Sequence, residues 1–146
     1  MKVEVNIDKN CKETKIVIYT QDINDKIIKL IENLQNKEME QLNGFKNGEM
    51  YLLNQNSIET IYTEDGKVFA RENGNIYLIK KRLYELEEIL NPDKFVRISN
   101  SEIVNMKKVQ KMNFKFSGTI ILYFTNEEKT YVSRRYLKKI KEYLGI

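Results

Sequence analysis

The sequence predicts a mainly β protein with short helices, preceded by a small strand-strand-helix extension. Beyond residue 45, short apolar runs alternate with turn signals such as Asp65-Gly66 and Asn73-Gly74, a pattern typical of consecutive strands. Helical periodicity in this part is confined to two short stretches. Hydrophobic residues make up 41% of the 146-residue chain, which is enough for the buried core of one domain with a small appendage.

Residues 1–44 are expected to form the extension. Residues 2–7 alternate apolar and polar side chains, and residues 15–20 are β-branched at their centre, so each run predicts a strand. A helix capped by Asp22 or Asn24 is expected next, because apolar residues recur there at spacings of three and four. These residues are Ile23, Ile27, Leu30, Ile31 and Leu34. Residues 36–44 are polar and end in Asn-Gly, which indicates a linker or a fraying helix end and places the domain boundary between 44 and 45.

Residues 45–146 are expected to form the second domain. Strands are predicted over residues 49–53, 58–62, 67–71, 76–79, 95–98, 112–116, 119–124 and 129–132. A helix is predicted over residues 82–90, with Leu83 and Leu86 facing inward, and the following Asn91-Pro92 pair ends it. The last helix is predicted after Ser133, with leucine and isoleucine on one side and lysines on the other.

The charge of the chain is unevenly distributed. The formal net charge is +4, but residues 94–146 hold 12 basic and 4 acidic side chains, a balance of +8, whereas residues 1–93 hold 13 basic and 17 acidic ones, a balance of −4. Such asymmetry points to a polyanionic partner for the basic part. The alternative from charge alone is a lysine-rich face that is merely solvated.

The composition gives little support to enzymatic chemistry. The sequence has no histidine, which removes the commonest general base and metal ligand, and its single Cys11 cannot form a CxxC site. No glycine-rich phosphate loop is present, and the adjacent carboxylates, such as Glu87-Glu88, point apart on a helix. We therefore expect no enzyme activity, no cofactor, no metal and no small-molecule substrate.

The same features indicate a cytoplasmic protein that does not interact with membranes. The longest apolar runs, such as residues 120–124, are far too short to cross a bilayer, and the N-terminus lacks the apolar core of a signal peptide. One cysteine excludes an internal disulfide and fits a reducing compartment.

Ser133, Arg134 and Arg135 indicate an anion-binding site. Ser133 is a candidate N-cap, which makes the two arginines the first residues of the last helix. Cations there oppose the helix macrodipole, at a cost of about 0.3–1 kcal/mol each, unless a phosphate or a base edge lies nearby. Asn100 and Ser101 could also contact DNA, because an asparagine side chain can bind adenine and a serine hydroxyl can reach a phosphate. For Asn100 and Ser133, capping of the local backbone is the structural alternative.

Two motifs carry a resemblance to a known family. The run FVRISNSEIVN covers residues 95–105, and the run VSRRY covers residues 132–136, with a hairpin around Asn126 between them. In this order and spacing, residues 45–146 resemble the LytTR-type DNA-binding domain of bacterial transcription regulators. The whole chain looks like the free-standing small regulators of that family, because 44 preceding residues are too few for a receiver domain.

The resemblance implies an elongated arrangement of small antiparallel β-sheets with short helices. It also implies that loops, and not a recognition helix, enter successive major grooves of DNA. The base-reading positions fall on Asn100 and Arg135, and Lys67 is the candidate in the loop over residues 63–67, where some members use a histidine. Other contacts, mainly to the DNA backbone, are expected from Arg97, Ser101, Tyr131, Ser133, Arg134, Lys138 and Lys139.

We therefore predict a sequence-specific, double-stranded-DNA-binding transcription regulator. The alternatives are a protein-interaction module with a solubilising basic face and an RNA-binding accessory protein. The apolar stripe of the N-terminal helix needs a partner, so we expect a homodimer formed mainly through residues 1–44. In the rival arrangement this segment folds back on its own DNA-binding domain.

Overall fold

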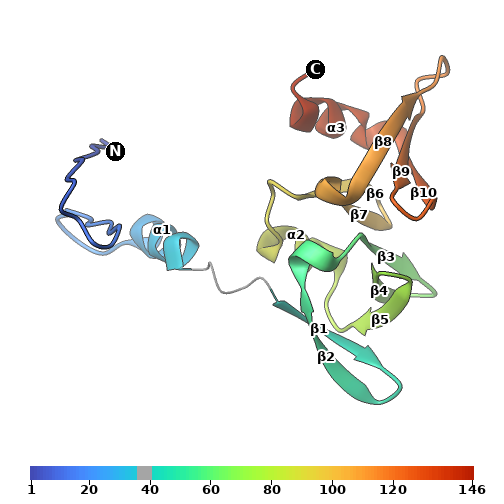
Figure 1. Cartoon of the computed structure of the whole chain (residues 1–146), viewed down its shortest axis with the longest axis horizontal. Coiled ribbons are helices and arrows are strands. Elements are labelled where there is room, and N and C mark those ends of the chain that lie inside the picture. Colours follow the sequence, from blue (N-terminus) through green and yellow to red (C-terminus); the bar gives the residue numbers. More distant parts are fainter. Residues whose placement is uncertain (36–40) are drawn as a thin grey trace. The chain divides into compact units, whose positions relative to one another are not determined.

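The computed structural model describes residues 1–35 and 41–146, which belong to two compact units, residues 1–36 and 37–146 (Figure 1). The first unit contains helix α1 (Asp25–Gln35). The side chain of Asn24 accepts a hydrogen bond from the backbone N–H of Ile27 at 3.1 Å, so Asn24 is the N-cap of the expected helix. Within residues 1–35 there is no helix long and apolar enough to cross a membrane, and the same holds for residues 41–146.

The prediction of two N-terminal strands is wrong, because residues 1–24 contain no strand in the structure. The polar turn between them does form, with the N–H of Cys11 donating to the carbonyl of Asp8 at 3.1 Å. The runs on either side of it stay unpaired, and Val3 and Val5 are exposed. Alternating side chains give a strand an apolar face, but a strand also needs a neighbour for its backbone hydrogen bonds, and this segment offers none.

The second unit contains two antiparallel sheets (Figure 1). The larger sheet has seven strands in the order β2-β1-β5-β4-β3-β7-β6, with bounds β1 Gln41–Lys46, β2 Glu49–Asn54, β3 Thr60–Glu64, β4 Lys67–Glu72, β5 Asn75–Ile79, β6 Phe95–Ser99 and β7 Glu102–Asn105. The smaller sheet has the order β10-β9-β8, with bounds β8 Val109–Phe114, β9 Ile120–Phe124 and β10 Lys129–Val132. The expected class, mainly β with short helices, is confirmed.

Five short helical elements complete the described part of this unit. Helix α2 (Leu83–Ile89) follows β5, and helix α3 (Leu137–Leu144) ends the chain. The 3-10 turns η2 (Gln55–Ser57), η3 (Met106–Lys108) and η4 (Arg134–Tyr136) join strands or lead into α3. Asn54 caps η2 and Asn105 caps η3, because each side-chain oxygen accepts from a backbone N–H two residues on, at 2.8 and 3.0 Å.

Strand β1 was not expected from the sequence. It pairs with β2 along its whole length and with β5 through Phe45 and Leu78, so the boundary expected between residues 44 and 45 falls inside a strand. Of the linker expected over residues 36–44, residues 36–40 lie outside the described residues. Gly44 permits the close packing of β1, since a Cβ there would lie 2.6 Å from Leu53 Cδ1 and 2.8 Å from Tyr77 Cβ.

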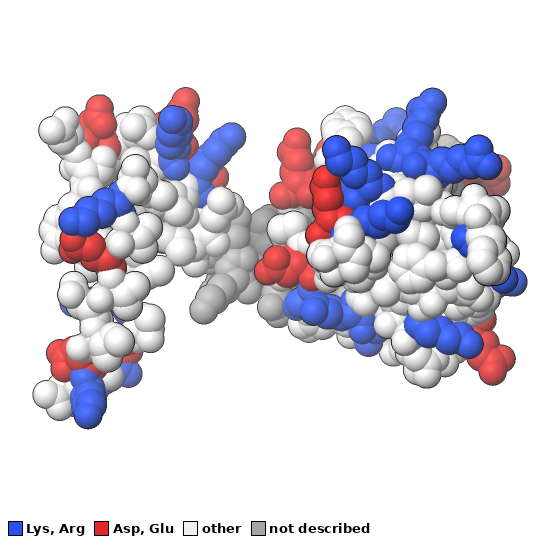
Figure 2. Space-filling view, turned by 90° about the horizontal axis from the view of Figure 1, so that it is seen from above, with Lys and Arg blue, Asp and Glu red and all other residues white. Residues whose placement is uncertain are grey.

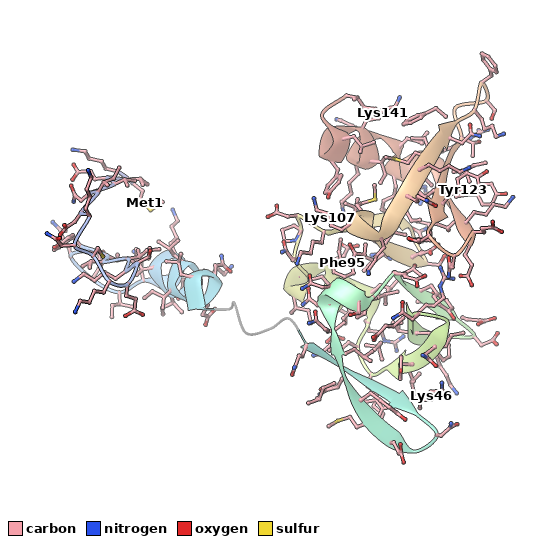
Figure 3. All side chains as sticks on the ribbon, in the orientation of Figure 1. Met1, Lys46, Phe95, Lys107, Tyr123 and Lys141 are labelled. Atoms are coloured by element: carbon pink, nitrogen blue, oxygen red, sulfur yellow. The ribbon has the colours of Figure 1, made fainter. Side chains whose placement is uncertain are left out.

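Two hydrophobic clusters share strands β6 and β7. Phe95 and Ile103 belong to a cluster with Leu83 and Leu86 of α2, whereas residues such as Ile98 join β9, β10 and α3 in the second. Phe95 lies at the level where the two sheets meet (Figure 3). Because successive side chains of a strand point to opposite faces, one strand pair serves both cores and fixes the larger sheet against the smaller one.

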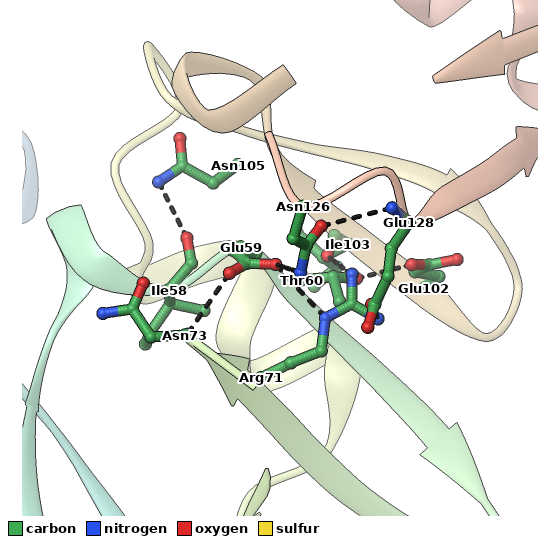
Figure 4. A network of polar contacts seen from close by, with 10 residues as sticks. All are labelled: Ile58, Glu59, Thr60, Arg71, Asn73, Glu102, Ile103, Asn105, Asn126 and Glu128. Carbon is green, nitrogen blue, oxygen red and sulfur yellow. Dashed lines mark hydrogen bonds and ion pairs between the residues drawn. The ribbon is translucent and has the colours of Figure 1, made fainter. Parts of the chain in front are cut away.

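A polar network reinforces the junction between the two sheets (Figure 4). The carboxylate of Glu59 accepts from Arg71 Nε at 3.3 Å, from the backbone N–H of Asn73 at 3.2 Å and from Asn126 Nδ2 at 3.4 Å. Arg71 also pairs with Glu128, in the smaller sheet's β9–β10 turn. Glu59 lies next to β3 of the larger sheet, so these contacts cross from one sheet to the other.

A second carboxylate of the junction is satisfied by hydroxyl groups. Glu102 of β7 accepts from Thr60 Oγ1 of β3 and from Thr130 Oγ1 of β10, each at 2.5 Å. The acidic side chains at the junction are therefore engaged in hydrogen bonds or ion pairs within the protein.

Candidate nucleic-acid interface

Arg97 holds the turn between β6 and β7 in place. Its Nε donates to the carbonyl of Ser99 at 2.9 Å, its Nη2 to the carbonyl of Asn100 at 2.6 Å, and its Nη1 pairs with Glu87 of α2 at 2.7 Å. The side chain is only 18% exposed. All three guanidinium nitrogens therefore have partners in the protein, and this residue, which was expected to contact DNA, holds the conformation of the turn.

The β6–β7 turn presents Asn100 at the surface. The hydroxyl of Ser99 accepts from the N–H of Ser101 at 3.2 Å, which closes the turn, and Asn100 itself is exposed. The Asn100 side chain is also oriented, because Tyr136 of η4 donates its hydroxyl to Asn100 Oδ1 at 3.0 Å. The amide nitrogen of Asn100 has no partner among the described residues, and its oxygen keeps a second lone pair.

Hydrogen bonds join this turn to two other segments. The N–H of Thr63 in β3 donates to the carbonyl of Ser101 at 2.8 Å, and the N–H of Ser133 donates to the carbonyl of Ile98 at 2.8 Å. The β3–β4 turn of Asp65 and Gly66, the β6–β7 turn and the segment that enters η4 are thereby held beside one another. Segments about 70 residues apart in the sequence therefore form one surface. It contains parts of all three segments named from the sequence, which are the loop over residues 63–67, the run 95–105 and the run 132–136.

The β3–β4 turn borders a surface groove of about 520 Å³. Asp65 and Gly66 both have positive φ, 51° and 74°, as a tight hairpin turn requires. The groove is lined by Thr63, Glu64, Asp65, Gly66, Val68, Arg82, Leu83, Tyr84, Arg97 and Asn100. Lys67 is exposed at the start of β4 and does not line the groove.

The arginines after Ser133 adopt a 3-10 turn and not the first turn of an α-helix. Ser133 has the extended backbone of an N-cap, with φ −65° and ψ 145°, but its side chain makes no capping hydrogen bond. Helix α3 begins only at Leu137, after Tyr136 with φ −107° and ψ 0°. The bond from Tyr136 to Asn100 accompanies this break, and the turn leaves Arg134 and Arg135 exposed.

The cations of this surface have no carboxylate partners. The side chains of Lys67, Arg134, Arg135, Lys138 and Lys139 are exposed and form no ion pair, hydrogen bond or ring contact within residues 1–35 and 41–146. Figure 2, which views the molecule from above Figure 1, shows lysines and arginines gathered on the second unit with fewer acidic side chains between them. Such a surface is suited to bind an anionic polymer.

A family model matches this part of the chain. The model of the LytTr DNA-binding domain covers residues 48–145, which include every strand after β1 and the helix α3. The chain belongs to the LytTr DNA-binding domain family. The resemblance inferred from the two sequence motifs is thereby confirmed.

Relatives and a solved structure agree with this family assignment. An uncharacterised HTH-type transcriptional regulator of Staphylococcus aureus (strain NCTC 8325) is 35% identical over 147 residues, covering 100% of this chain and 99% of the relative. The corresponding regulator of strain N315 has the same identity and coverage. The LytTr DNA-binding domain of a methyl-accepting/DNA response regulator from Bacillus cereus superposes with a TM-score of 0.70 at 21% identity, over 73% of this chain and 98% of that domain.

The remaining LytTr positions named from the sequence lie on either side of η4 along the chain. Tyr131 of β10 is 51% exposed, with the ammonium group of Lys129 5.9 Å from its ring centroid. Lys138 and Lys139 follow η4 in the first turn of α3. Arg82 and Tyr84 also line the groove, although neither was named from the sequence. For Arg82, the run of three cations at residues 80–82 was a signal in the sequence.

Proposed function

We propose that this LytTr-family protein is a transcription regulator that binds specific sequences of double-stranded DNA through its loops. One observation carries the proposal: hydrogen bonds hold three separate segments beside one another, and the cations around them are unpaired. In this proposal the β3–β4 turn, the β6–β7 turn and the η4 segment enter the major groove. Arg134, Lys138 and Lys139 supply phosphate contacts around them, and Lys67 is the candidate base contact of the β3–β4 turn.

Asn100 and Arg135 are proposed to read bases. An asparagine can bind adenine through both amide atoms, donating from Nδ2 to N7 and accepting at Oδ1 from N6. The hydrogen bond from Tyr136 leaves this possible, because it uses one of the two lone pairs of Asn100 Oδ1 and fixes the side chain. Arg135 is exposed with a free guanidinium group, which suits bidentate binding to guanine O6 and N7.

The other predicted residues are proposed to position the chain or to contact the DNA backbone. Ser101 and Ser133 present hydroxyl groups beside the reading residues, and Tyr131 presents a half-exposed phenol. Arg97 is proposed to act through the turn that it holds, because its guanidinium nitrogens already have partners. We further propose that the protein works in the cytoplasm and without catalysis.

Electrophoretic mobility shift with the DNA upstream of the protein's own gene tests this function. Specific retention is expected, and the logarithm of the affinity should fall linearly with the logarithm of the salt concentration. Neutralising about 5–8 phosphates predicts a slope of roughly −4 to −7. Equal retention of RNA and unrelated DNA would favour an RNA-binding accessory protein, and retention of no nucleic acid would favour a protein-interaction module.

We also propose that residues 1–44 mediate a homodimer. Helix α1 carries an apolar stripe that is not fully covered by the rest of its unit. Leu34, near the end of the helix, is 40% exposed, and Ile23, just before the helix, is 73% exposed. A dimer would suit paired half-sites in DNA. The test is sedimentation of the full chain at tens of micromolar. Leu30→Glu should give a monomer, whereas Asn33→Glu, which adds the same charge on an exposed position, should remain dimeric; a wild-type monomer would refute the proposal.

A further inference from the structure

Three consecutive cations connect the larger sheet to helix α2. Lys80, Lys81 and Arg82 lie between the end of β5 and the start of α2, and all three are exposed. They belong to the part of the chain whose overall charge balance is negative, so the charge distribution of the sequence does not reveal them.

The position of Arg82 relates this segment to the proposed DNA surface. Arg82 and Tyr84 line the same groove as Gly66 of the β3–β4 turn and Asn100 of the β6–β7 turn. Tyr84 is 65% exposed, so the groove is open to a large ligand on this side. Arg82 therefore borders two of the three segments that are proposed to enter the major groove, and Lys81 precedes it directly in the chain.

Lys81 and Arg82 have no internal partner for their charges. Among residues 1–35 and 41–146, neither side chain forms an ion pair, a hydrogen bond or a ring contact. The nearby carboxylates are used elsewhere: Glu85 accepts from the backbone N–H of Arg82 at 3.3 Å, and Glu87 pairs with Arg97. Lys80 differs, because its ammonium group lies over the ring of Phe45, 4.2 Å from the centroid.

Among the described residues, the acidic side of the groove forms no ion pair with these cations either. Glu64 and Asp65 line the groove from the β3–β4 turn, yet no ion pair joins them to Arg82 in the part of the chain that the structure describes. Three adjacent positive charges repel one another in the free protein, and an anion that binds to them removes this repulsion.

We propose that residues 80–82 form a fourth DNA-contact segment, in which Lys81 and Arg82 bind phosphates beside the base pairs that face the β3–β4 turn. This inference rests on the proposed function. Phosphate contacts carry no sequence information, so the segment adds affinity and sets the position of the β3–β4 turn on the duplex. Lys80 packs on Phe45 and holds the segment against the sheet.

The test compares Lys81→Ala and Arg82→Ala with the wild-type chain in salt-dependent binding to specific and to random DNA. Each variant should bind both DNAs several-fold more weakly, and the salt slope should fall by roughly 0.9 for each phosphate contact that is lost. Arg82→Lys should retain most of the slope, because it keeps the charge. Lys107→Ala is the matched control: Lys107 is exposed on η3 (Figure 3), at the opposite end of the smaller sheet from Ser133.

The outcomes separate this inference from the function on which it rests. If the wild-type chain fails to bind DNA, the proposed function is wrong. If the wild-type chain binds with a steep salt slope and both alanine variants keep that slope, only the fourth contact segment is wrong. An equal loss of slope in Lys107→Ala would show a general effect of net charge and would also overturn the inference. Circular dichroism checks that each variant is folded.

Discussion

The junction between the two sheets and the surface formed by the loops use the same residue types in opposite ways. At the junction, Arg71 pairs with Glu59 and Glu128, and Glu59 is only 8% exposed. On the loop surface, Arg134 and Arg135 are exposed and have no partner among the described residues. Arginines that are paired hold the protein together, and arginines without a partner are available to an external anion.

Arg97 belongs to the first group although it lies beside the second. Its sequence position in the FVRISNS motif suggested DNA contact, whereas its three hydrogen bonds place it with the structural arginines. The partners of a cation, more than its place in a motif, indicate its role. Four substitutions test this comparison, in order of decreasing effect.

Glu59→Ala should have the largest effect, on stability. It removes the acceptor of Arg71, Asn73 and Asn126 at a buried position and leaves the Arg71 charge partly buried with one remaining carboxylate partner, Glu128. We expect a loss of about 2–3 kcal/mol in the free energy of unfolding, measured by chemical denaturation. Glu88→Ala, a control at an exposed position of α2, should cost less. Equal losses would show that the junction network is not important for stability.

Arg135→Ala should weaken specific DNA binding by about 1–3 kcal/mol and relax the choice of base at one position. The free energy of unfolding should stay nearly unchanged, because the side chain has no partner in the protein. Lys139→Ala is the comparison and should weaken binding to specific and random DNA alike. Full sequence specificity in a folded Arg135→Ala protein would refute base reading by this residue.

Arg97→Ala should affect both properties, because it releases the β6–β7 turn. Loss of the hydrogen bonds to Ser99 and Asn100 and of the pair with Glu87 is expected to cost about 1–2 kcal/mol of stability. DNA affinity should fall as well. Arg97→Lys should not restore it, since one lysine ammonium group cannot bind Ser99, Asn100 and Glu87 with the geometry of the guanidinium group. Restoration by lysine would indicate a simple phosphate contact instead.

Ser133→Ala should have the smallest effect on stability. A serine that caps a helix typically contributes about 1 kcal/mol, but the Ser133 side chain makes no capping bond. We expect the free energy of unfolding to change by less than roughly 0.5 kcal/mol. DNA affinity should fall modestly if the hydroxyl donates to a phosphate. Destabilisation by a full kilocalorie would show that the hydroxyl caps η4 in solution.

Local sequence signals predicted the hairpins well and the N-terminal strands badly. The Asp65-Gly66 and Asn73-Gly74 turns lie where expected, because the positive φ angles that they require are a local property. The runs at residues 2–7 and 15–20 have strand-like alternation but no partner, and pairing is not a local property. Strand β1 was missed for the converse reason, since its polar residues become a strand only through β2 and β5.

The candidate site shows the same limit. Asn100 and Arg135 could be named from two motifs, because the resemblance places them residue by residue. The internal partners of Arg97 could not be predicted, since one of them, Glu87, belongs to another element. The proposal for residues 80–82 depends on the groove that Arg82 shares with Asn100, which the sequence alone does not show. Whether each named residue touches DNA stays a prediction.

The hydrogen bonds from Thr63 to Ser101 and from Ser133 to Ile98 have a thermodynamic consequence. Because the loops are tied to the strands before any ligand arrives, association requires little ordering of the chain, and little conformational entropy is lost. Calorimetry of DNA binding should therefore show a small negative heat-capacity change, smaller than that of a regulator whose reading segments fold only on the duplex. Encounter with DNA should be fast and limited by electrostatic attraction, with no slow refolding phase.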